Sequence, residues 1–330
     1  MKTKSTSQTP RTLTRNAILL AITALALCAS PAVAVAADCI PTTTWTDSNG
    51  SWFVAGKWNN GVPNAGTSAY INNAGTANIS STGAAACNLT LGYDAVDSGT
   101  VSVNGGSLTV TNEVEVGAYG EGTLTITNQG NVTAGLLTIA ALQNVSGSPS
   151  IGTVTVDGST VTVTTRLDVG GDNGTPGGIA LLSVTNSGTV SAANVHVYKS
   201  GTLTGNGTVT TTNGTTIEGT IEPSGGRLTI GGNLTFFGTA PLMESNVVPA
   251  SADNVYVSNG AASLTGRLKV TMTGTFTPGT TYTLLHADNG LGNTKFSSVS
   301  ITFPPGQGWS PVIIYDTNNV KLNLAATTGP

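Results

Sequence analysis

The residues best placed for chemistry are charged side chains that recur at matching places along the chain. Arg166, Asp168 and Asp172 lie close together, and His196 and Lys199 follow about 30 residues later. Carboxylates clustered with basic side chains can bind Ca²⁺ or supply the acid and base that cleave a glycosidic bond. The cluster therefore raises the hypothesis of an enzyme that acts on polysaccharides.

A plainer interpretation comes from where two of these residues stand in a 19-residue repeat. Asp168 and His196 both occupy position 17, between two aliphatic residues, so their side chains point away from a core. We favour the view that this outward position simply accepts polar residues, which are Glu115, Thr138, Asp168 and His196 in the four repeats. The sequence therefore predicts a non-enzymatic protein, with no catalytic residue, no cofactor and no metal ligand.

The repeat itself is the strongest signal in the sequence. Residues 99–117, 122–140, 152–170 and 180–198 align without gaps as four copies. Positions 3, 5, 16 and 18 are aliphatic in every copy. They are Val101, Val103, Val114 and Val116, then Leu124, Ile126, Leu137 and Ile139, then Val154, Val156, Leu167 and Val169, and finally Leu182, Val184, Val195 and Val197.

This spacing predicts short strands that are stacked as a solenoid. Aliphatic residues two apart, with polar residues between them, are typical of a strand with one buried face. Clusters such as Asn104-Gly105-Gly106 and Asn186-Ser187-Gly188 supply turns with positive φ between the strands. Equal positions that stack in successive coils predict a right-handed parallel β-helix. An antiparallel sandwich is the alternative, but its strands need not align without gaps.

The first 36 residues have the features of a signal peptide. A basic segment is followed by an apolar run at 17–27 and by the small-x-small motif Ala34-Val35-Ala36. No later run is long and apolar enough to span a bilayer, so we expect no transmembrane segment in the mature chain. Export through the inner membrane places the mature chain at the cell surface, outside the cell or in the periplasm.

The composition of the mature chain excludes some partners. Without residues 1–36 it has 8 Lys and Arg against 16 Asp and Glu, which gives a net charge of −8. Such an acidic chain is unsuited to nucleic acid or to anionic membranes. Two cysteines remain, Cys39 and Cys87, and in an exported chain we expect them to form a disulfide rather than to stay as two buried thiols.

Residues 37–87 are predicted to cap the N-terminal end of the helix. They contain Trp45, Trp52 and Trp58, three of the four tryptophans. Large aromatic side chains cover an exposed coil end efficiently. Exposed tryptophans can also stack on sugar rings, but their spacing does not alternate on one strand face, so we favour the cap.

Residues 88–240 are predicted to form the β-helix and residues 241–330 a C-terminal β region. The blocks LTGNGTV, GTIEPSGGRLTIGGNLTF, DNVYVSNGAASLTGRLKV, FTPGTTYTLLHADNGLGNTKFSSV and VIIYDTNNVKLNL follow one another in the second half of the chain. In this order they resemble the C-terminal part of autotransporter passenger domains. The three tryptophans followed by Pro63, and the GTLTIT-type repeats, resemble the N-terminal and repeat regions of the same family.

The resemblance implies a β-helix that is displayed on, or released from, a Gram-negative cell. Members of this family commonly act in adhesion, aggregation or biofilm formation, so the implied partners are a host or neighbouring-cell surface, extracellular matrix or glycans. A self-exporting member carries a C-terminal translocator barrel, for which this sequence shows no pattern of amphipathic strands. We therefore expect a passenger-only relative or a truncated gene product. The open alternatives are a polysaccharide-binding or polysaccharide-degrading protein and a structural protein of the periplasm.

Overall fold

The computed structural model describes residues 39–142, 149–306 and 308–326, which belong to one compact unit, Ala37–Pro330. The predicted signal peptide, residues 1–36, lies outside the described residues. Nearly all regular structure is β. The one helix among the described residues is the short 3₁₀ helix η1 (Ala55–Lys57), and none there is long and apolar enough to cross a membrane.

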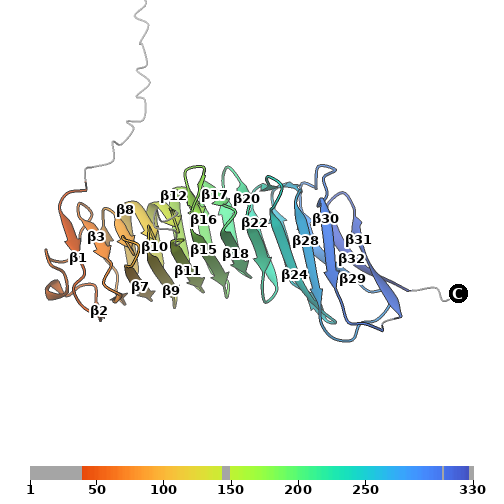
Figure 1. Cartoon of the computed structure of the whole chain (residues 1–330), viewed down its shortest axis with the longest axis horizontal. Coiled ribbons are helices and arrows are strands. Elements are labelled where there is room, and N and C mark those ends of the chain that lie inside the picture. Colours follow the sequence, from red (N-terminus) through yellow and green to blue (C-terminus); the bar gives the residue numbers. More distant parts are fainter. Residues whose placement is uncertain (1–38, 143–148, 307, 327–330) are drawn as a thin grey trace, which may run out of the picture. The chain divides into compact units, whose positions relative to one another are not determined.

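Two long sheets run along the stack of coils (Figure 1). The 12-stranded sheet contains, in order, β2 (Asn49–Ser51), β4 (Gly75–Ile79), β7 (Ser98–Asn104), β9 (Glu121–Thr127), β11 (Ile151–Asp157), β15 (Ile179–Thr185), β18 (Gly201–Gly205), β21 (Thr220–Pro223), β24 (Leu242–Val248), β28 (Arg267–Met272) and β30 (Ser298–Thr302), with β25 (Ser251–Ala252) beside β24.

The 18-stranded sheet forms the remaining faces of the coils. It contains β1 (Thr42–Thr44), β3 (Ser68–Ile71), β5 (Ala84–Ala86), β6 (Leu89–Leu91), β8 (Ser107–Val116), β10 (Asn131–Ile139), β12 (Thr160–Val169), β16 (Thr189–Ala192), β17 (Asn194–Val197), β19 (Thr208–Thr211), β20 (Thr215–Ile217), β22 (Arg227–Gly231), β23 (Leu234–Phe236), β26 (Asn254–Ser258), β27 (Ala262–Ser263), β29 (Thr281–Ala287), β31 (Trp309–Tyr315) and β32 (Asn319–Ala326). A separate hairpin consists of β13 (Gly171–Asp172) and β14 (Thr175–Pro176).

The predicted parallel β-helix is confirmed. Leu137 pairs with Leu167, and Leu167 pairs with Val195, on successive parallel strands. All sixteen aliphatic residues of the four copies are 0–1% exposed and belong to a single core. The sequence pattern therefore identifies the inward side chains of these coils, and the antiparallel alternative does not apply to them.

Three coils turn a corner inside a long strand of the 18-stranded sheet, namely in β8, β10 and β12. In β10 the register shifts between Ala134 and Leu136, where the strand passes from one face to the next. Gly135 lies at this corner, and a Cβ there would collide with the Asn112 carbonyl oxygen of the preceding coil. Further along the chain the corner separates two strands, such as β16 and β17.

Between neighbouring copies the gapless alignment of the repeats is wrong by one residue in the middle. Val114 pairs with Leu137, 23 residues later, as the alignment predicts. Leu108, however, pairs with Val132, which is 24 residues later. The second copy therefore gains one residue before this segment and loses one after it, at the corner, so the overall length does not reveal the shift.

The turn before that segment explains the extra residue. The first copy turns with one left-handed residue, Gly105, whose φ is 69°. The second copy uses two, Asn128 and Gln129, with φ of 53° and 64°. The fourth copy uses the same turn at Asn186 and Ser187. Left-handed residues other than glycine are uncommon, so the alignment did not separate the two turn types.

The three tryptophans pack inside the N-terminal end, as the predicted cap requires. Trp45, Trp52 and Trp58 are 1%, 0% and 4% exposed. Trp58 meets each of the other two rings edge to face, with centroids 5.0 and 4.8 Å apart, and its indole N–H donates to the Trp52 carbonyl at 2.8 Å. Rings buried in this way cannot stack on a sugar, so they do not form the alternative sugar platform.

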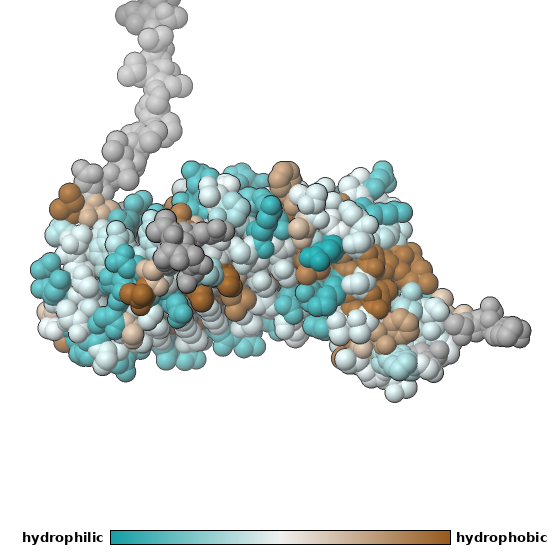
Figure 2. All heavy atoms as spheres, viewed as in Figure 1, coloured by the Kyte–Doolittle hydropathy of each residue, from teal (hydrophilic) through white to brown (hydrophobic). Residues whose placement is uncertain are grey.

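Parallel stacking extends beyond residues 88–240 at both ends. At the N-terminal end β1 pairs in parallel with β3, and beyond residue 240 β24 pairs in parallel with β28, and β28 with β30. The stack ends where β29, β32 and β31 pair antiparallel. Exposed apolar side chains gather toward the C-terminal end (Figure 2), and they include Val299 on β30 and Val312 and Ile314 on β31.

A disulfide joins Cys39 to Cys87, with the Cα atoms 5.7 Å apart. Cys87 is buried, and its N–H donates to the Thr67 carbonyl at 2.8 Å. The Ser68 hydroxyl donates to the Cys39 carbonyl at 3.1 Å. The bridge therefore attaches the start of the described chain to the first coils.

Candidate functional site

The position-17 side chains form one row on the outer face of the 18-stranded sheet. Each member pairs in register with the next, so the residues stack from coil to coil as predicted. In chain order the row is Tyr70, Thr90, Glu115, Thr138, Asp168, His196 and Thr216. This row brings Glu115, Asp168 and His196 to one face, which is the condition for any chemistry among them.

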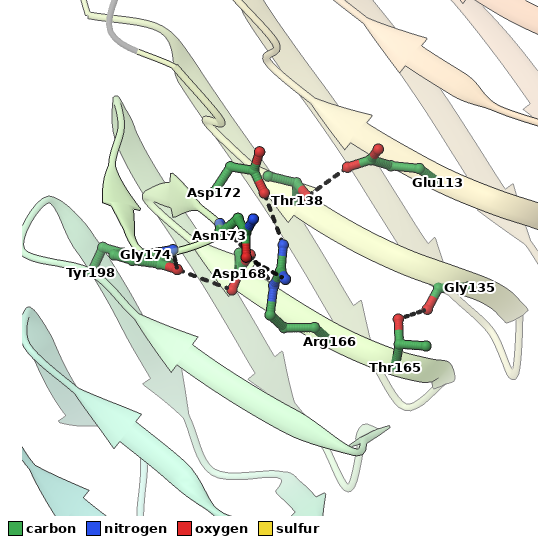
Figure 3. Close-up of polar contacts among 10 residues, drawn as sticks. All are labelled: Glu113, Gly135, Thr138, Thr165, Arg166, Asp168, Asp172, Asn173, Gly174 and Tyr198. Atoms are coloured by element: carbon green, nitrogen blue, oxygen red, sulfur yellow. Dashed lines mark hydrogen bonds and ion pairs between the residues drawn. The ribbon is translucent and has the colours of Figure 1, made fainter. Parts of the chain in front are cut away.

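Asp168 is nevertheless fully buried. Its side chain points away from the core but is covered by the hairpin of β13 and β14, by Arg166 and by Tyr198 (Figure 3). The Arg166 Nε–H donates to Asp168 Oδ2, and the Asn173 N–H donates to the same oxygen at 3.2 Å. The Tyr198 hydroxyl lies 3.5 Å from Oδ1. The expectation of a solvated outward position is therefore wrong at Asp168, because the spacer after the third copy folds back over it. The same expectation is wrong at Thr138, which is also 0% exposed.

Arg166 joins this buried carboxylate to the hairpin. Its Nη2 donates to Asp172 Oδ1 at 2.8 Å, and its Nη1 donates to Asn173 Oδ1 at 3.2 Å. From the neighbouring coil, the Tyr198 hydroxyl accepts the Gly174 N–H at 2.7 Å. Figure 3 shows these groups converging beneath the hairpin. We call the group Arg166, Asp168, Asp172 and Tyr198 the hairpin latch.

His196 and Lys199 do not join the latch. The His196 ring stacks on Tyr198, with centroids 3.9 Å apart and planes inclined by 17°. Its Nε2 lies 2.9 Å from Glu218 Oε1 on the other side. The Lys199 side chain is exposed. Of the predicted constellation, the structure brings together Arg166 with the two aspartates and leaves the other two residues outside.

A second carboxylate, which the sequence analysis did not single out, lies next to the row. Glu113 stands two residues before Glu115 on β8, so both side chains leave the same face. Burial, together with the Glu115 carboxylate, raises the pKa of Glu113 to about 7. The Thr138 hydroxyl donates to Glu113 Oε1 at 2.8 Å and opposes this rise. The Glu-x-Glu spacing within a strand was the signal that could have revealed this pair.

Glu115 also accepts a hydrogen bond from a neighbouring coil, but from β6, whereas the partner of Glu113 is on β10. The Thr90 hydroxyl donates to Glu115 Oε2 at 3.1 Å. Burial raises the pKa of Glu115, and this hydrogen bond opposes the rise. Each glutamate thus accepts a threonine hydroxyl from a neighbouring strand of the sheet. These two hydrogen bonds therefore connect side chains of adjacent coils.

These contacts favour a structural role for the cluster over a catalytic one. Burial raises the pKa of Asp168, while the Asn173 N–H and the Arg166 guanidinium act against the rise. An acid or base in catalysis must reach the proton that it transfers, and Asp168 is covered. In the described part of the chain, no group of three or more His, Cys, Asp or Glu side chains is placed to hold a metal ion.

Comparison of the sequence with protein-family models and with curated proteins gives no match in either case.

Proposed function

We propose that this protein is an exported, non-enzymatic β-helical protein of the autotransporter-passenger type that acts by surface contact in adhesion, aggregation or biofilm formation. The observation that carries the proposal is that the β-helix uses its main cluster of charged side chains, the hairpin latch, to hold its own hairpin in place. Asp168, the most buried carboxylate of that cluster, is engaged by the protein's own hairpin and is not open to a substrate.

The outer faces of the coils support this proposal because they offer repeated polar contacts. Thr100, Thr123 and Thr153 occupy matching places on β7, β9 and β11, and their side chains are only partly buried. On later coils Ser183 stands beside Thr204 and Thr202 beside Thr220, and the rows are interrupted at Leu181 and Glu222. Such rows present hydroxyl groups at the strand spacing of about 4.8 Å. A regular, weakly charged surface suits many weak contacts with a glycan or with another cell.

Surface display tests the proposal directly. The chain, fused to a heterologous translocator barrel and expressed in a laboratory strain, is expected to reach the surface, to be cleaved by external protease and to speed the settling of the cells. A matched strain that displays an unrelated β-helix of similar length is the control. Equal settling of the two strains would contradict a contact function. Location in the producing cell is a separate question, and fractionation there decides between surface, released and periplasmic protein.

The second candidate is cleavage of a polysaccharide, and Glu113 is the observation that favours it. A carboxyl with a pKa raised to about 7 beside another carboxylate is suited to act as a general acid. Release of reducing ends from acidic and neutral polysaccharides, measured for the wild type and for Glu113→Gln, tests this candidate. Activity that disappears in the variant would replace the contact function with an enzymatic one.

A further inference from the structure

A shallow hollow lies on the outer face of the 18-stranded sheet near its C-terminal end, far along the chain from the hairpin latch. Its volume is about 250 Å³, and it is lined by Arg227, Asn254, Tyr256, Thr283, His286 and Asn319. These residues come from the adjacent strands β22, β26, β29 and β32. The size is below the roughly 300–1,000 Å³ of ordinary small-molecule sites, which suits a single ring of a longer ligand.

Arg227 gives the hollow its charge. It is one of three arginines in the chain after residue 36. Its guanidinium carbon lies 5.2 Å from the centre of the Tyr256 ring, within the range of a cation–π contact. Among the residues that the structure describes, no carboxylate forms an ion pair with Arg227. An exposed arginine that is fixed in place by a ring can receive an external anion with little loss of conformational freedom.

Neighbouring contacts fix the rest of the lining. The Tyr256 hydroxyl donates to Asp288 Oδ2 at 3.1 Å, which holds the ring beneath Arg227. His286 Nδ1 lies 2.8 Å from Asn319 Oδ1, and its Nε2 lies 3.2 Å from Asp288 Oδ1. The side chains of Tyr256 and His286 are therefore held in position by contacts within the protein itself.

Three acidic groups bond to the lining of the hollow or next to it, and each has a partner. Asp316 accepts a hydrogen bond from the Asn319 amide at 2.8 Å and pairs with Lys321. Asp253 accepts the Gly226 N–H, next to Arg227, at 2.6 Å.

Asp288 bonds to Tyr256 and His286. Its Oδ2 also accepts the Asn259 N–H at 2.8 Å. This backbone donor, followed by Tyr256 and His286, lowers the pKa of Asp288. The carboxylate is thus ionised but surrounded by donors, and it does not line the hollow. The repulsion that it exerts on an anion beside Arg227 is correspondingly reduced.

We propose that this hollow binds one carboxylated sugar ring of an acidic polysaccharide, with the Arg227 guanidinium paired to the sugar carboxylate. A planar guanidinium matches a carboxylate through two parallel hydrogen bonds, which favours a uronate over a neutral sugar. The Asn254 Nδ2 donates to the Ala252 carbonyl, so its Oδ1 remains to accept a sugar hydroxyl, and the exposed Thr283 hydroxyl offers a second contact. The inference rests on the proposed contact function, for which it names a ligand class.

Binding of an oligogalacturonate to the purified exported protein tests the proposal by calorimetric titration at low and moderate salt. The neutral probe is the same oligomer after reduction of its carboxylates, and the sulfate probe is dextran sulfate. We expect binding of the uronate, loss of at least tenfold in affinity for Arg227→Gln, and an intermediate loss for Arg227→Lys, which keeps the charge but not the planar fork. The matched control is Arg267→Gln, which removes the same charge from exposed β28 of the other sheet.

The outcomes separate this site from the proposed function. No binding by folded wild-type protein, equal binding of the reduced oligomer, or tighter binding of dextran sulfate would overturn the uronate site. An equal loss for Arg267→Gln would overturn it as well, because diffuse charge would then explain the binding. If displayed cells settle faster while the purified protein binds no uronate, the contact function stands and only the site fails. If neither occurs, both fail.

Discussion

Asp168 and His196 are paired residues of adjacent parallel strands, yet their side chains serve different neighbours. Asp168 is covered by the hairpin and bonds to Arg166, whereas His196 stacks on Tyr198 and meets Glu218. Stacking in register therefore brings residues to one face without making them one site. What separates these two is the hairpin of β13 and β14, which covers Asp168 completely, whereas the His196 side chain stays 25% exposed.

Asp168→Ala should destabilise the protein far more than Asp172→Ala. Asp168 is fully buried, and its truncation leaves the Arg166 Nε–H, the Asn173 N–H and the Tyr198 hydroxyl without their acceptor beneath the hairpin, which costs about 3 kcal/mol. Asp172 is 41% exposed, so loss of its ion pair with Arg166 should cost below about 1 kcal/mol. Thermal unfolding measures the global effect, and hydrogen exchange of residues 171–176 measures the local one. Equal effects of the two variants would show that the hairpin is not latched by Asp168.

Glu113→Gln should stabilise the protein at alkaline pH and change little at acid pH. The pKa of Glu113 is raised from 4.5 to about 7, so its ionisation opposes folding. Below pH 4.5 the carboxyl is protonated in both states and costs nothing. As pH rises from 4.5 to 7 the wild type loses stability, by about 3 kcal/mol once the loss is complete above pH 7. The variant has no such loss, so its advantage should grow over this window.

Melting temperatures of wild type and Glu113→Gln between pH 4 and pH 8.5 check this prediction. The charged groups that act on Glu113 are Glu115, Asp172 and Arg166, and they are unchanged in the variant. Glu121→Gln, at an exposed position of β9, is the control and should give a difference that does not depend on pH in this window. A constant difference for Glu113→Gln would mean that Glu113 ionises in the folded protein as readily as in the unfolded chain.

Removal of the disulfide should cost about 4 kcal/mol. Cys39 and Cys87 are 48 residues apart in the sequence, and a loop of this length gives that value in the chain-entropy treatment. Denaturant unfolding of a Cys39→Ser, Cys87→Ser variant measures the loss. Intact mass after alkylation without reductant tests the bond itself, since two alkylated thiols in native exported protein would show that no bridge forms.

The sequence predicted the inward side chains well because burial there follows a strict period of two. Val154 and Val156 are aliphatic for the same reason that Leu124 and Ile126 are, namely that each packs against its equivalent one coil away. The turn types were less visible. Aliphatic residues stand at positions 10 and 12 of the first and third copies but at 11 and 13 of the second and fourth, and this alternation was the available sign of the shifted register.

The candidate site was harder to predict because its environment comes from outside the repeat. Nothing in the strand around Asp168 shows that it is buried, since the cover is supplied by a spacer that the other copies do not share. The contact between Gly174 and Tyr198 joins residues 24 positions apart across two coils. Periodicity predicts which face a side chain leaves, but it does not predict what folds over that face.

Val156→Asp and Thr155→Asp test the register of the third copy. Val156 is fully buried and lies between Ile126 and Val184 on the adjacent coils. An aspartate there has no route to water, so the change should cost several kcal/mol, about 3 or more. Thr155 leaves the opposite face, where it is only partly buried, and its replacement should cost below about 1 kcal/mol.

Thermal melts of the two variants, made in the same background, give the comparison. The pair is well matched, because the same side chain is introduced at neighbouring positions of one strand. A register that was off by one residue would exchange the two effects, since every side chain would move to the other face. A greater loss for Thr155→Asp would therefore contradict the inward placement of Val154 and Val156, and with it the stacking of this coil on its neighbours.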